Sequence, residues 1–167
     1  MALLPITQIG NPILRKKGES LTRITSADRR LIQDMIDTMH FAEGVGLAAN
    51  QVGVSLRIII ISPTAKRGEE RVVINPEILS QSGNVTEREG CLSIPGFLAR
   101  VTRATRVQLK GLTQQGESKL WELEGFSAVI VQHEVDHING ILFLDHLKHW
   151  EKQRSEKWLR QRQESLG

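Results

Sequence analysis

The chain has 167 residues and a formal net charge of +3, with 40% hydrophobic and 25% charged residues. These values are typical of a soluble globular protein with one sizeable core. No apolar run reaches the roughly 18 residues of a transmembrane helix, and the opening MALLPITQIG lacks the basic region of a signal peptide. Neither a membrane span nor a secretion signal is therefore expected.

The first predicted element is a helix over SADRRLIQDMIDTMHFAEG, which begins at Ser26. Ser26 is a plausible N-cap, and Asp28 places a negative charge in the first turn. Leu31, Met35 and Met39 recur at intervals of four, which predicts one apolar helix face. The glycines that follow end the element.

Strands are predicted next. Four consecutive isoleucines in LRIIIISP indicate a strand buried on both faces. ERVVINPEIL predicts a second strand that ends near Pro76. VTRATRVQLKGLTQQG and KLWELEGF then read as strands joined by a polar turn. The pattern predicts strands within residues 56–63, 70–79, 101–116 and 119–126.

A central helix is predicted around His133, although the β-branched run AVIVQ alone could form a strand. Ala128, Val131, Val135 and Ile138 share one helical face, and Asn139-Gly140 is a good terminator. A short apolar segment, GILFLDHL, follows. The predicted fold class is α+β, with antiparallel strands packed around the central helix that bears H-E-x-x-H, an N-terminal helix and a C-terminal helix.

The C-terminal segment is basic. Residues 148–167 hold six Lys and Arg against three Glu, so 6 − 3 = +3 and the other residues balance to zero. Such a segment could contact nucleic acid or a ribonucleoprotein. The alternative is a solvated helix face with mixed charges, and charge alone favours this alternative. We expect residues 1–167 to form a single catalytic domain, with 148–167 as its basic terminal helix.

The stretch VQHEVDHING contains H-E-x-x-H. On a helix His133 and His137 lie on one face and can reach one metal ion. A third ligand is needed. The metzincin pattern fails because Phe143 occupies its third ligand position. A glutamate from a later helix, as in thermolysin-like enzymes, would have to come from a strongly charged segment that holds Glu151, Glu156 and Glu164.

Cys91 is the only cysteine, so no intramolecular disulfide is possible and a reducing cytosol is indicated. It lies in EREGCLSIPG, where Gly90 lets the backbone approach a bound group closely. A thiolate with two imidazoles would leave one position open for water, as a catalytic site requires. The alternative is that Cys91 is a small buried apolar residue.

A third unusual segment is EGVGLAANQVG, residues 43–53. Gly44, Gly46 and Ala49 resemble a dinucleotide fingerprint, but they follow a predicted helix rather than a strand, and the Lys of a P-loop is missing. Small residues here give a ligand access to the backbone, and Gln51 offers an amide donor for a developing oxyanion. A tight loop with a polar surface glutamine is the alternative.

Together the three segments resemble the peptide deformylase family, which is marked by G-x-G-x-A-A-x-Q, then E-G-C-x-S, then Q-H-E-x-D-H. This sequence has GVGLAANQ at 44–51, EGCLS at 89–93 and QHEVDH at 132–137. The resemblance covers nearly the whole chain, from NPILRKKGE to GILFLDHL. Two positions depart from it: Ile138 replaces the usual Leu, and His146 stands where Arg is common.

The resemblance implies a role for each matching position. In the family Glu89 pairs with an arginine that matches Arg103, a structural pairing that braces the cysteine loop. The implied metal ligands are Cys91, His133 and His137. The implied catalytic groups are Glu134 as general base and acid, with Gln51 and the Leu92 N–H as oxyanion donors. The implied substrate-binding residues are Gly46 and Gly90 along the peptide backbone, and Val45, Val129 and Ile130 around the methionine side chain.

The implied activity is the metal-dependent removal of the formyl group from N-formylmethionyl peptides of newly made proteins, with release of formate. The implied cofactor is one divalent ion, Fe(II) in cells, with Zn(II), Ni(II) or Co(II) as substitutes. Implied partners are nascent peptides and the ribosome, the latter through the terminal helix; no membrane and no specific DNA are expected. The bacterial cytoplasm is favoured over an organelle stroma or matrix.

Two other functions fit the motifs before any resemblance is considered. The first is a metallopeptidase with an unfamiliar ligand set that cleaves internal peptide bonds. The second is a binding protein with a closed structural metal site, whose fourth ligand would come from the remaining histidines, His40, His146 and His149. Product analysis separates the first from a deformylase, and water exchange at the metal separates the second.

Overall fold

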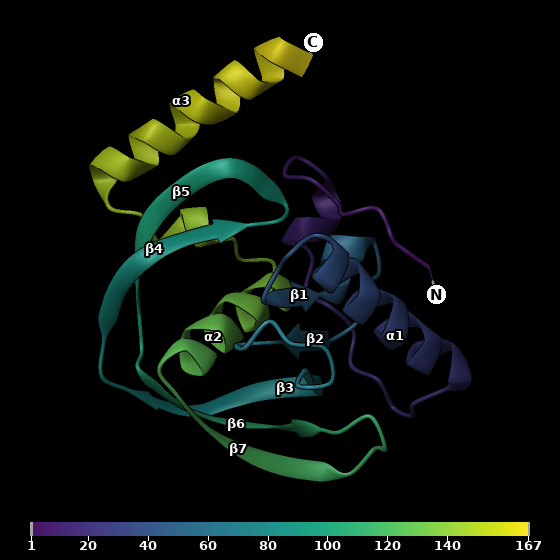
Figure 1. The fold of residues 1–167 in the computed structure, drawn as a ribbon. Coiled ribbons are helices and arrows are strands. Elements are labelled where there is room, and N and C mark those ends of the chain that lie inside the picture. The colour runs from purple at the N-terminus through teal and green to yellow at the C-terminus, as the bar shows by residue number, and fades with distance from the viewer. Residues whose placement is uncertain (1, 167) are drawn as a thin grey trace.

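The computed structural model describes residues 2–166. Helix α2 (Phe126–Ile138) lies in the middle of the molecule, between a five-stranded antiparallel sheet and a two-stranded one (Figure 1). Helix α1 (Ser26–Phe41) packs on the far side of the large sheet, and α3 (His149–Leu166) stands beyond the small sheet. The predicted α+β arrangement is confirmed.

The large sheet has the order β1-β2-β3-β6-β7, and every neighbouring pair is antiparallel. The small sheet is the hairpin of β4 and β5, joined by a tight turn. The strands are β1 (Gly46–Ala48), β2 (Ile58–Ile61), β3 (Arg71–Ser82), β4 (Val85–Cys91), β5 (Ile94–Arg103), β6 (Arg106–Leu112) and β7 (Ser118–Glu124), and the 3-10 turns are η1 (Pro12–Arg15), η2 (Ala49–Val52) and η3 (Phe143–His146).

The isoleucines of β2 explain why α2 is central. Ile59 and Ile61 pack with the apolar face of α2, whereas Ile58 and Ile60 pack with α1, and none of the four is exposed to solvent. A strand covered by helices on both faces needs a continuous apolar run rather than an alternating one. The predicted apolar face of α2, from Ala128 to Ile138, lies in the same cluster as Ile59.

Two boundaries differ from the prediction. The N-cap of α1 is Thr25, not Ser26, and Thr25 forms a reciprocal capping box with Asp28. Strand β3 does not end near Pro76, because a register shift between Ile74 and Glu77 accommodates the proline, and the strand continues to Ser82.

The predicted strand over residues 101–116 is the end of β5, a break and then β6. At the break, the Gln132 side chain bonds both backbone groups of Ala104, at 3.0 and 2.9 Å. The hairpin of β4 and β5 was not predicted as such. Among residues 2–166, no helix has both the length and the apolar character needed to cross a membrane.

Candidate metal centre and peptide pocket

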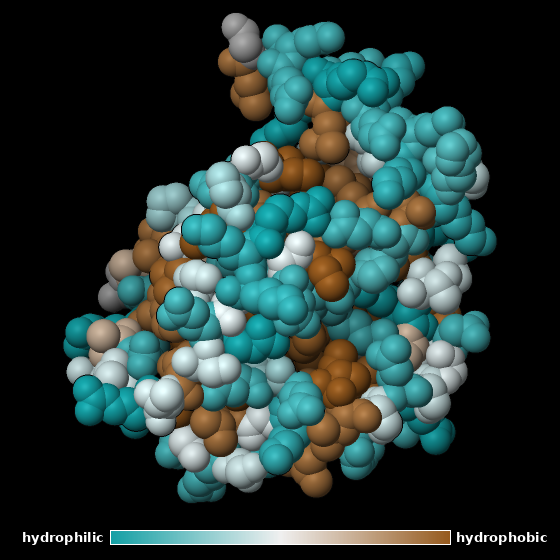
Figure 2. All heavy atoms as spheres, turned by 180° about the vertical axis from the view of Figure 1, so that it is seen from behind, coloured by the Kyte–Doolittle hydropathy of each residue, from teal (hydrophilic) through white to brown (hydrophobic). Residues whose placement is uncertain are grey.

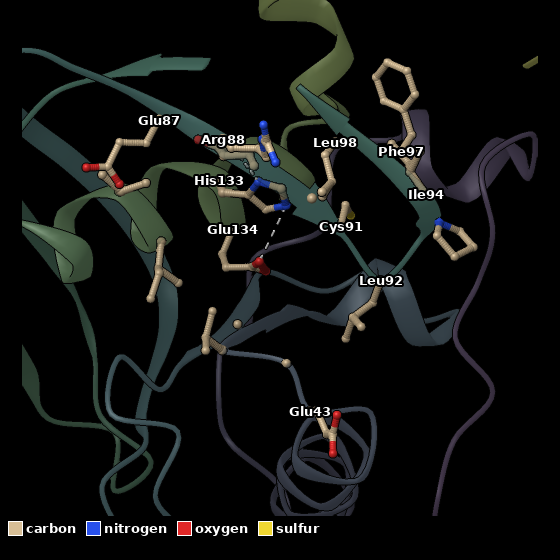
Figure 3. Close-up of a pocket in the computed structure, with 18 of the residues that line it drawn as sticks. Glu43, Glu87, Arg88, Cys91, Leu92, Ile94, Phe97, Leu98, His133 and Glu134 are labelled. Carbon is tan, nitrogen blue, oxygen red and sulfur yellow. Dashed lines mark hydrogen bonds and ion pairs between the residues drawn. The ribbon is translucent and has the colours of Figure 1, made fainter. Parts of the chain in front are cut away.

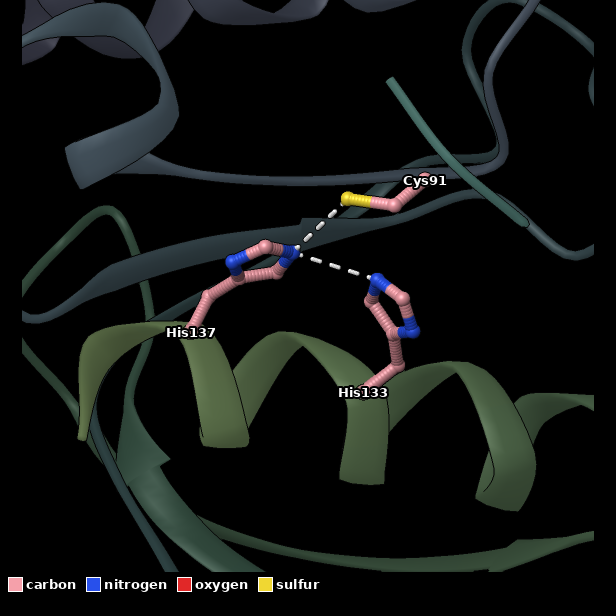
Figure 4. A group of neighbouring side chains, drawn as sticks. All are labelled: Cys91, His133 and His137. Atoms are coloured by element: carbon pink, nitrogen blue, oxygen red, sulfur yellow. Dashed lines mark hydrogen bonds between the residues drawn. The ribbon is translucent and has the colours of Figure 1, made fainter. Parts of the chain in front are cut away.

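Three donor atoms converge between α2 and the end of β4 (Figure 4). His133 and His137 lie one turn apart on α2, with their Nε2 atoms 3.1 Å apart. The Cys91 Sγ lies 3.3 Å from the His137 Nε2, and the three donor atoms all lie within 4.8 Å of one another. One thiol and two imidazoles are a donor set that zinc and other borderline divalent metals accept, so the residues fit a metal ion.

The turn between β4 and β5 brings the thiol to the helix. Cys91 pairs with Ile94, after a register shift that follows Glu89. Ile94 is fully buried in an apolar cluster with Phe97 and Phe143, and Cys91 packs against this cluster. The buried isoleucine therefore anchors the loop that carries the sulfur.

A chain of polar side chains orients the first histidine. The His133 Nδ1 lies 2.9 Å from the Glu89 carboxylate, which also accepts from the Arg103 Nε and Nη2 at 2.9 and 3.0 Å. Arg103 donates in turn to Asp136, at 2.7 Å, and His146 lies 2.8 Å from the same Asp136 oxygen. The expected Glu89–Arg103 pair is confirmed, and the contact of His146, left open by the sequence, is found.

The electrostatic consequence falls on Glu89. Burial would raise the pKa of its carboxyl group, but the hydrogen bonds from His133 and Arg103 outweigh burial and lower the pKa to about 2. Glu89 is therefore a carboxylate. Burial would lower the pKa of His133, but hydrogen bonds to Cys91 and Glu89 raise it to about 10 in the metal-free protein. When a metal takes the place of the Nε2 proton, Glu89 holds the remaining proton of the then neutral His133 on Nδ1. That tautomer leaves the Nε2 lone pair free for a metal.

Glu134 points into the cavity beside His133 (Figure 3). It is 3% exposed, and its Oε2 has no hydrogen-bond partner among residues 2–166. Burial raises the pKa of this carboxyl group to about 7. A carboxyl group poised near neutrality, with one unpartnered oxygen, suits general acid–base work.

Gln51 and Leu92 approach the centre from two other elements. Gln51, on η2, is 1% exposed and its Oε1 accepts from the Ala48 N–H at 3.0 Å. Its Nε2 donates to the Ser93 hydroxyl at 3.1 Å and lies 3.6 Å from the Cys91 Sγ. Ser93, which sequence reasoning did not single out, thus fixes the amide. Leu92 follows Cys91 in the turn and lines the same cavity.

The cavity has a volume of about 480 Å³, large enough for a side chain and adjoining peptide. Every residue expected to bind substrate lines it. At Gly46 a Cβ atom would lie 2.9 Å from the Ile130 Cγ2 and 3.0 Å from the Glu134 Cδ, so only glycine fits without displacing the carboxylate. The predicted lining residues are Val45, Gly46, Gly90, Val129 and Ile130.

Other lining residues carried no recognisable signal in the sequence. They are charged or apolar residues, and their role depends on a fold that the motifs do not reveal. Leu98 and Phe126 are about half exposed, at 49% and 52%. The additional side chains include Glu43, Glu87, Arg88, Phe97, Leu98 and Phe126.

The fold and the site define a class: a hydrolase built on H-E-x-x-H, with a cysteine sulfur beside the two histidines. The polypeptide deformylase family model matches residues 3–153. A peptide deformylase of Halothermothrix orenii is 48% identical over 145 residues, covering 87% of this chain and 94% of that protein. The chain belongs to the polypeptide deformylase family.

Solved structures agree. The peptide deformylase of Legionella pneumophila superposes with a TM-score of 0.92 at 38% identity, covering 99% of this chain and 98% of the other. That of Thermotoga maritima gives 0.85 at 37% identity, with 89% of this chain and all of the other covered. The chain is an enzyme that removes the N-terminal formyl group from N-formylmethionyl peptides of newly made proteins and releases formate, in a metal-dependent reaction.

Proposed function

We propose that Cys91, His133 and His137 hold a single catalytic ion, Fe(II) in cells, which Zn(II), Ni(II) or Co(II) can replace. The convergence of their donor atoms within 4.8 Å supports this assignment, because no other group of three potential ligands forms among residues 2–166. The ion, when bound, supplies Lewis acidity and lowers the pKa of a water molecule. Cys91 and His133 also line the cavity, so the centre is open on the substrate side.

Glu134 is the proposed general base and acid. Its carboxylate takes a proton from the attacking water and returns it to the amine that leaves when formate departs. The unpartnered Oε2 and the pKa of about 7 support both directions of transfer.

Gln51 and the Leu92 N–H are the proposed donors to the oxygen that becomes negative on the formyl group. The Gln51 amide has two protons. One is held by Ser93, and the other faces the Cys91 side of the centre, as the 3.6 Å contact with the sulfur indicates. Removal of one such donor typically costs about 3 kcal/mol of transition-state stabilisation.

The peptide is proposed to enter as an extended strand beside Gly46 and Gly90, whose missing side chains let two backbones approach. Val45, Val129 and Ile130 would surround the methionine side chain. A formyl group offers no side chain to recognise, so selectivity must come from the methionine and the adjoining backbone. The location of all five residues on one cavity supports this assignment.

The decisive experiment compares formyl-Met-Ala-Ser with acetyl-Met-Ala-Ser. We expect formate from the first peptide, no acetate from the second, and intact Met–Ala and Ala–Ser bonds in both. Cleavage of an internal bond would support a metallopeptidase instead.

The metal assignment is tested by elemental analysis of anaerobically purified protein. We expect about one ion per chain in the wild type and a clear loss in Cys91→Ser and His133→Ala. His149→Ala, which removes a histidine on α3 outside the centre, is the matched control and should keep the ion. Full metal content in Cys91→Ser would remove the sulfur from the ligand set.

We further propose that residues 1–167 work as one catalytic domain in the bacterial cytoplasm, an organelle stroma or matrix being the alternative location. The basic segment 148–167, most of which is helix α3, carries a net charge of +3, and this charge would allow contact with ribosomal RNA. Hydrophilic side chains cover most of this projecting helix (Figure 2). If protein truncated after Leu147 still sediments with ribosomes at low salt as full-length protein does, the ribosome contact is refuted.

A further inference from the structure

Helix α3 contacts the strand that forms one wall of the catalytic cavity. The Arg154 Nη2 donates to the Leu98 carbonyl at 2.7 Å, and its guanidinium lies 4.6 Å from the centroid of the Phe97 ring. One turn earlier on α3, the Glu151 carboxylate accepts from the Arg100 N–H at 3.1 Å. Glu151 and Arg154 thus hold both backbone polar groups that flank Ala99.

Burial shows that this contact is a packed interface rather than a loose surface pair. Glu151 and Ser155 are only 4% and 3% exposed. The Trp158 ring packs at 5.4 Å, centroid to centroid, on Phe97, within the same apolar cluster that supports Cys91. Arg154 itself is half exposed, so its ion pair with Glu151 at 3.5 Å contributes little, and its bond to a fixed carbonyl matters more.

The segment that α3 holds is the rim of the cavity. Phe97 and Leu98, which are neighbours on β5, both line the cavity. The Leu98 side chain lies directly over Gly90: a Cβ atom there would be 2.7 Å from the Leu98 Cδ2. One residue therefore has its carbonyl bonded to α3 and its side chain at the edge of the peptide site (Figure 3).

We propose that α3 sets the geometry of this rim, with Arg154 as the positioning residue and Leu98 as the side chain that contacts the bound peptide. The proposal rests on the cavity being the peptide site. Arg154 and Trp158 lie beyond residue 153, where the match to the family model ends. A partner that binds the outer face of α3 would then change the affinity of the cavity for the peptide.

Steady-state kinetics with formyl-Met-Ala-Ser test the proposal in full-length, metal-loaded enzyme. We expect Arg154→Ala to raise KM on the order of three- to tenfold, with kcat and metal content unchanged. The reason is that the substitution weakens peptide binding and leaves the reacting groups in place. The matched control is Arg160→Ala, which removes the same charge from an exposed position of the same helix and should keep the wild-type KM.

Two further measurements distinguish positioning from a general loss of stability. Arg154→Lys keeps the charge and one donor and should recover part of the lost KM. Amide exchange at Arg100 should be faster in Arg154→Ala than in Arg160→Ala, while exchange within α2 stays the same. A wild-type KM in both Arg154 variants overturns the proposal; a wild-type enzyme that released no formate would count against the function itself.

Discussion

Glu134, the proposed general base and acid, illustrates how the surroundings of a buried carboxyl group shift its pKa. It lies on α2 beside His133, and its oxygen faces the cavity rather than solvent. Burial raises the pKa of the group to about 7, so both protonation states are accessible near neutral pH. The two histidines on either side of it in sequence have donor atoms that converge on Cys91, whereas Glu134 does not join that group.

Replacement of Glu134 therefore separates catalysis from metal binding. We expect Glu134→Gln and Glu134→Ala to lower kcat by about 10² to 10⁴ because proton transfer is lost, with unchanged metal content. The measurement is formate release beside elemental analysis of the same samples. If either variant loses the metal, Glu134 is a ligand and the assignment of roles is wrong.

Gly46 shows how little room the centre leaves. An added methyl group would contact Ile130 and the Glu134 carboxyl, so one of them must move. We expect Gly46→Ala to lower kcat/KM by about 10- to 100-fold, since a misplacement near 1 Å has effects of this size. The melting temperature and metal content serve as controls, and unchanged kinetics would show that the carboxylate is not constrained there.

Glu89 makes the stability of the folded protein depend on pH in the acidic range. Its folded pKa of about 2 lies below the ordinary value of 4.5, so the carboxylate stabilises the fold fully above pH 4.5, and this contribution is lost as pH falls from 4.5 towards 2. In metal-free protein, Glu89→Gln should be less stable at pH 7 and lose less stability between pH 5 and pH 3. Equal losses in both proteins, measured by urea unfolding, would contradict this origin.

At the scale of elements, α2 is held by its polar side chains as well as by its apolar face. Gln132, 7% exposed, bonds the N–H and the carbonyl of Ala104 and also the Ala128 carbonyl. It replaces the ladder bonds that Ala104 lacks where β5 gives way to β6. The residue before His133, a proposed metal ligand, is thus a structural bridge between helix and sheet.

We expect Gln132→Leu to lower the free energy of unfolding by about 2 to 4 kcal/mol, because two buried backbone groups lose their partner. Urea unfolding of the metal-free protein measures it. Gln161→Leu, at an exposed position of α3, is the control and should change stability little. A similar small change in both variants would mean that Ala104 finds another partner.

The elements differ in how far the sequence predicts them. Helix α2 was predicted because its apolar residues recur at helical spacing and Asn139-Gly140 ends it. The hairpin of β4 and β5 was missed because charged residues at 87–89 and Pro95-Gly96 disrupt the alternation typical of a strand. The prediction that β3 ends near Pro76 was wrong, because a register shift lets the proline remain inside the strand.

At the scale of the whole molecule, the proposed metal would connect the small sheet to the helix that packs on the large sheet. Cys91 belongs to the small sheet, and both histidines belong to the helix that packs on the large one. Spacing alone predicted the histidine pair. The third donor could be proposed only by elimination and by resemblance, because nothing local in the sequence indicates that Cys91 lies beside α2.

Removal of the metal should therefore weaken the fold. A ligand at 100 times its Kd stabilises the native state by about 2.7 kcal/mol, which corresponds to a shift on the order of 5 to 10 °C for a chain of this size. Thermal unfolding with and without a chelator measures the shift, and Cys91→Ser should show a smaller one. Equal melting temperatures of loaded and metal-free wild type would exclude a bridging ion.

The order of the three donors along the chain also affects how the protein is made. Cys91 and His137 are 46 residues apart, so they meet only after a long loop closes, which is slow relative to local folding. A growing polypeptide that has reached the hairpin contains the sulfur but not yet the two imidazoles that lie beside it in the folded protein. During synthesis, the three donors can consequently come together only after the later helix has been made.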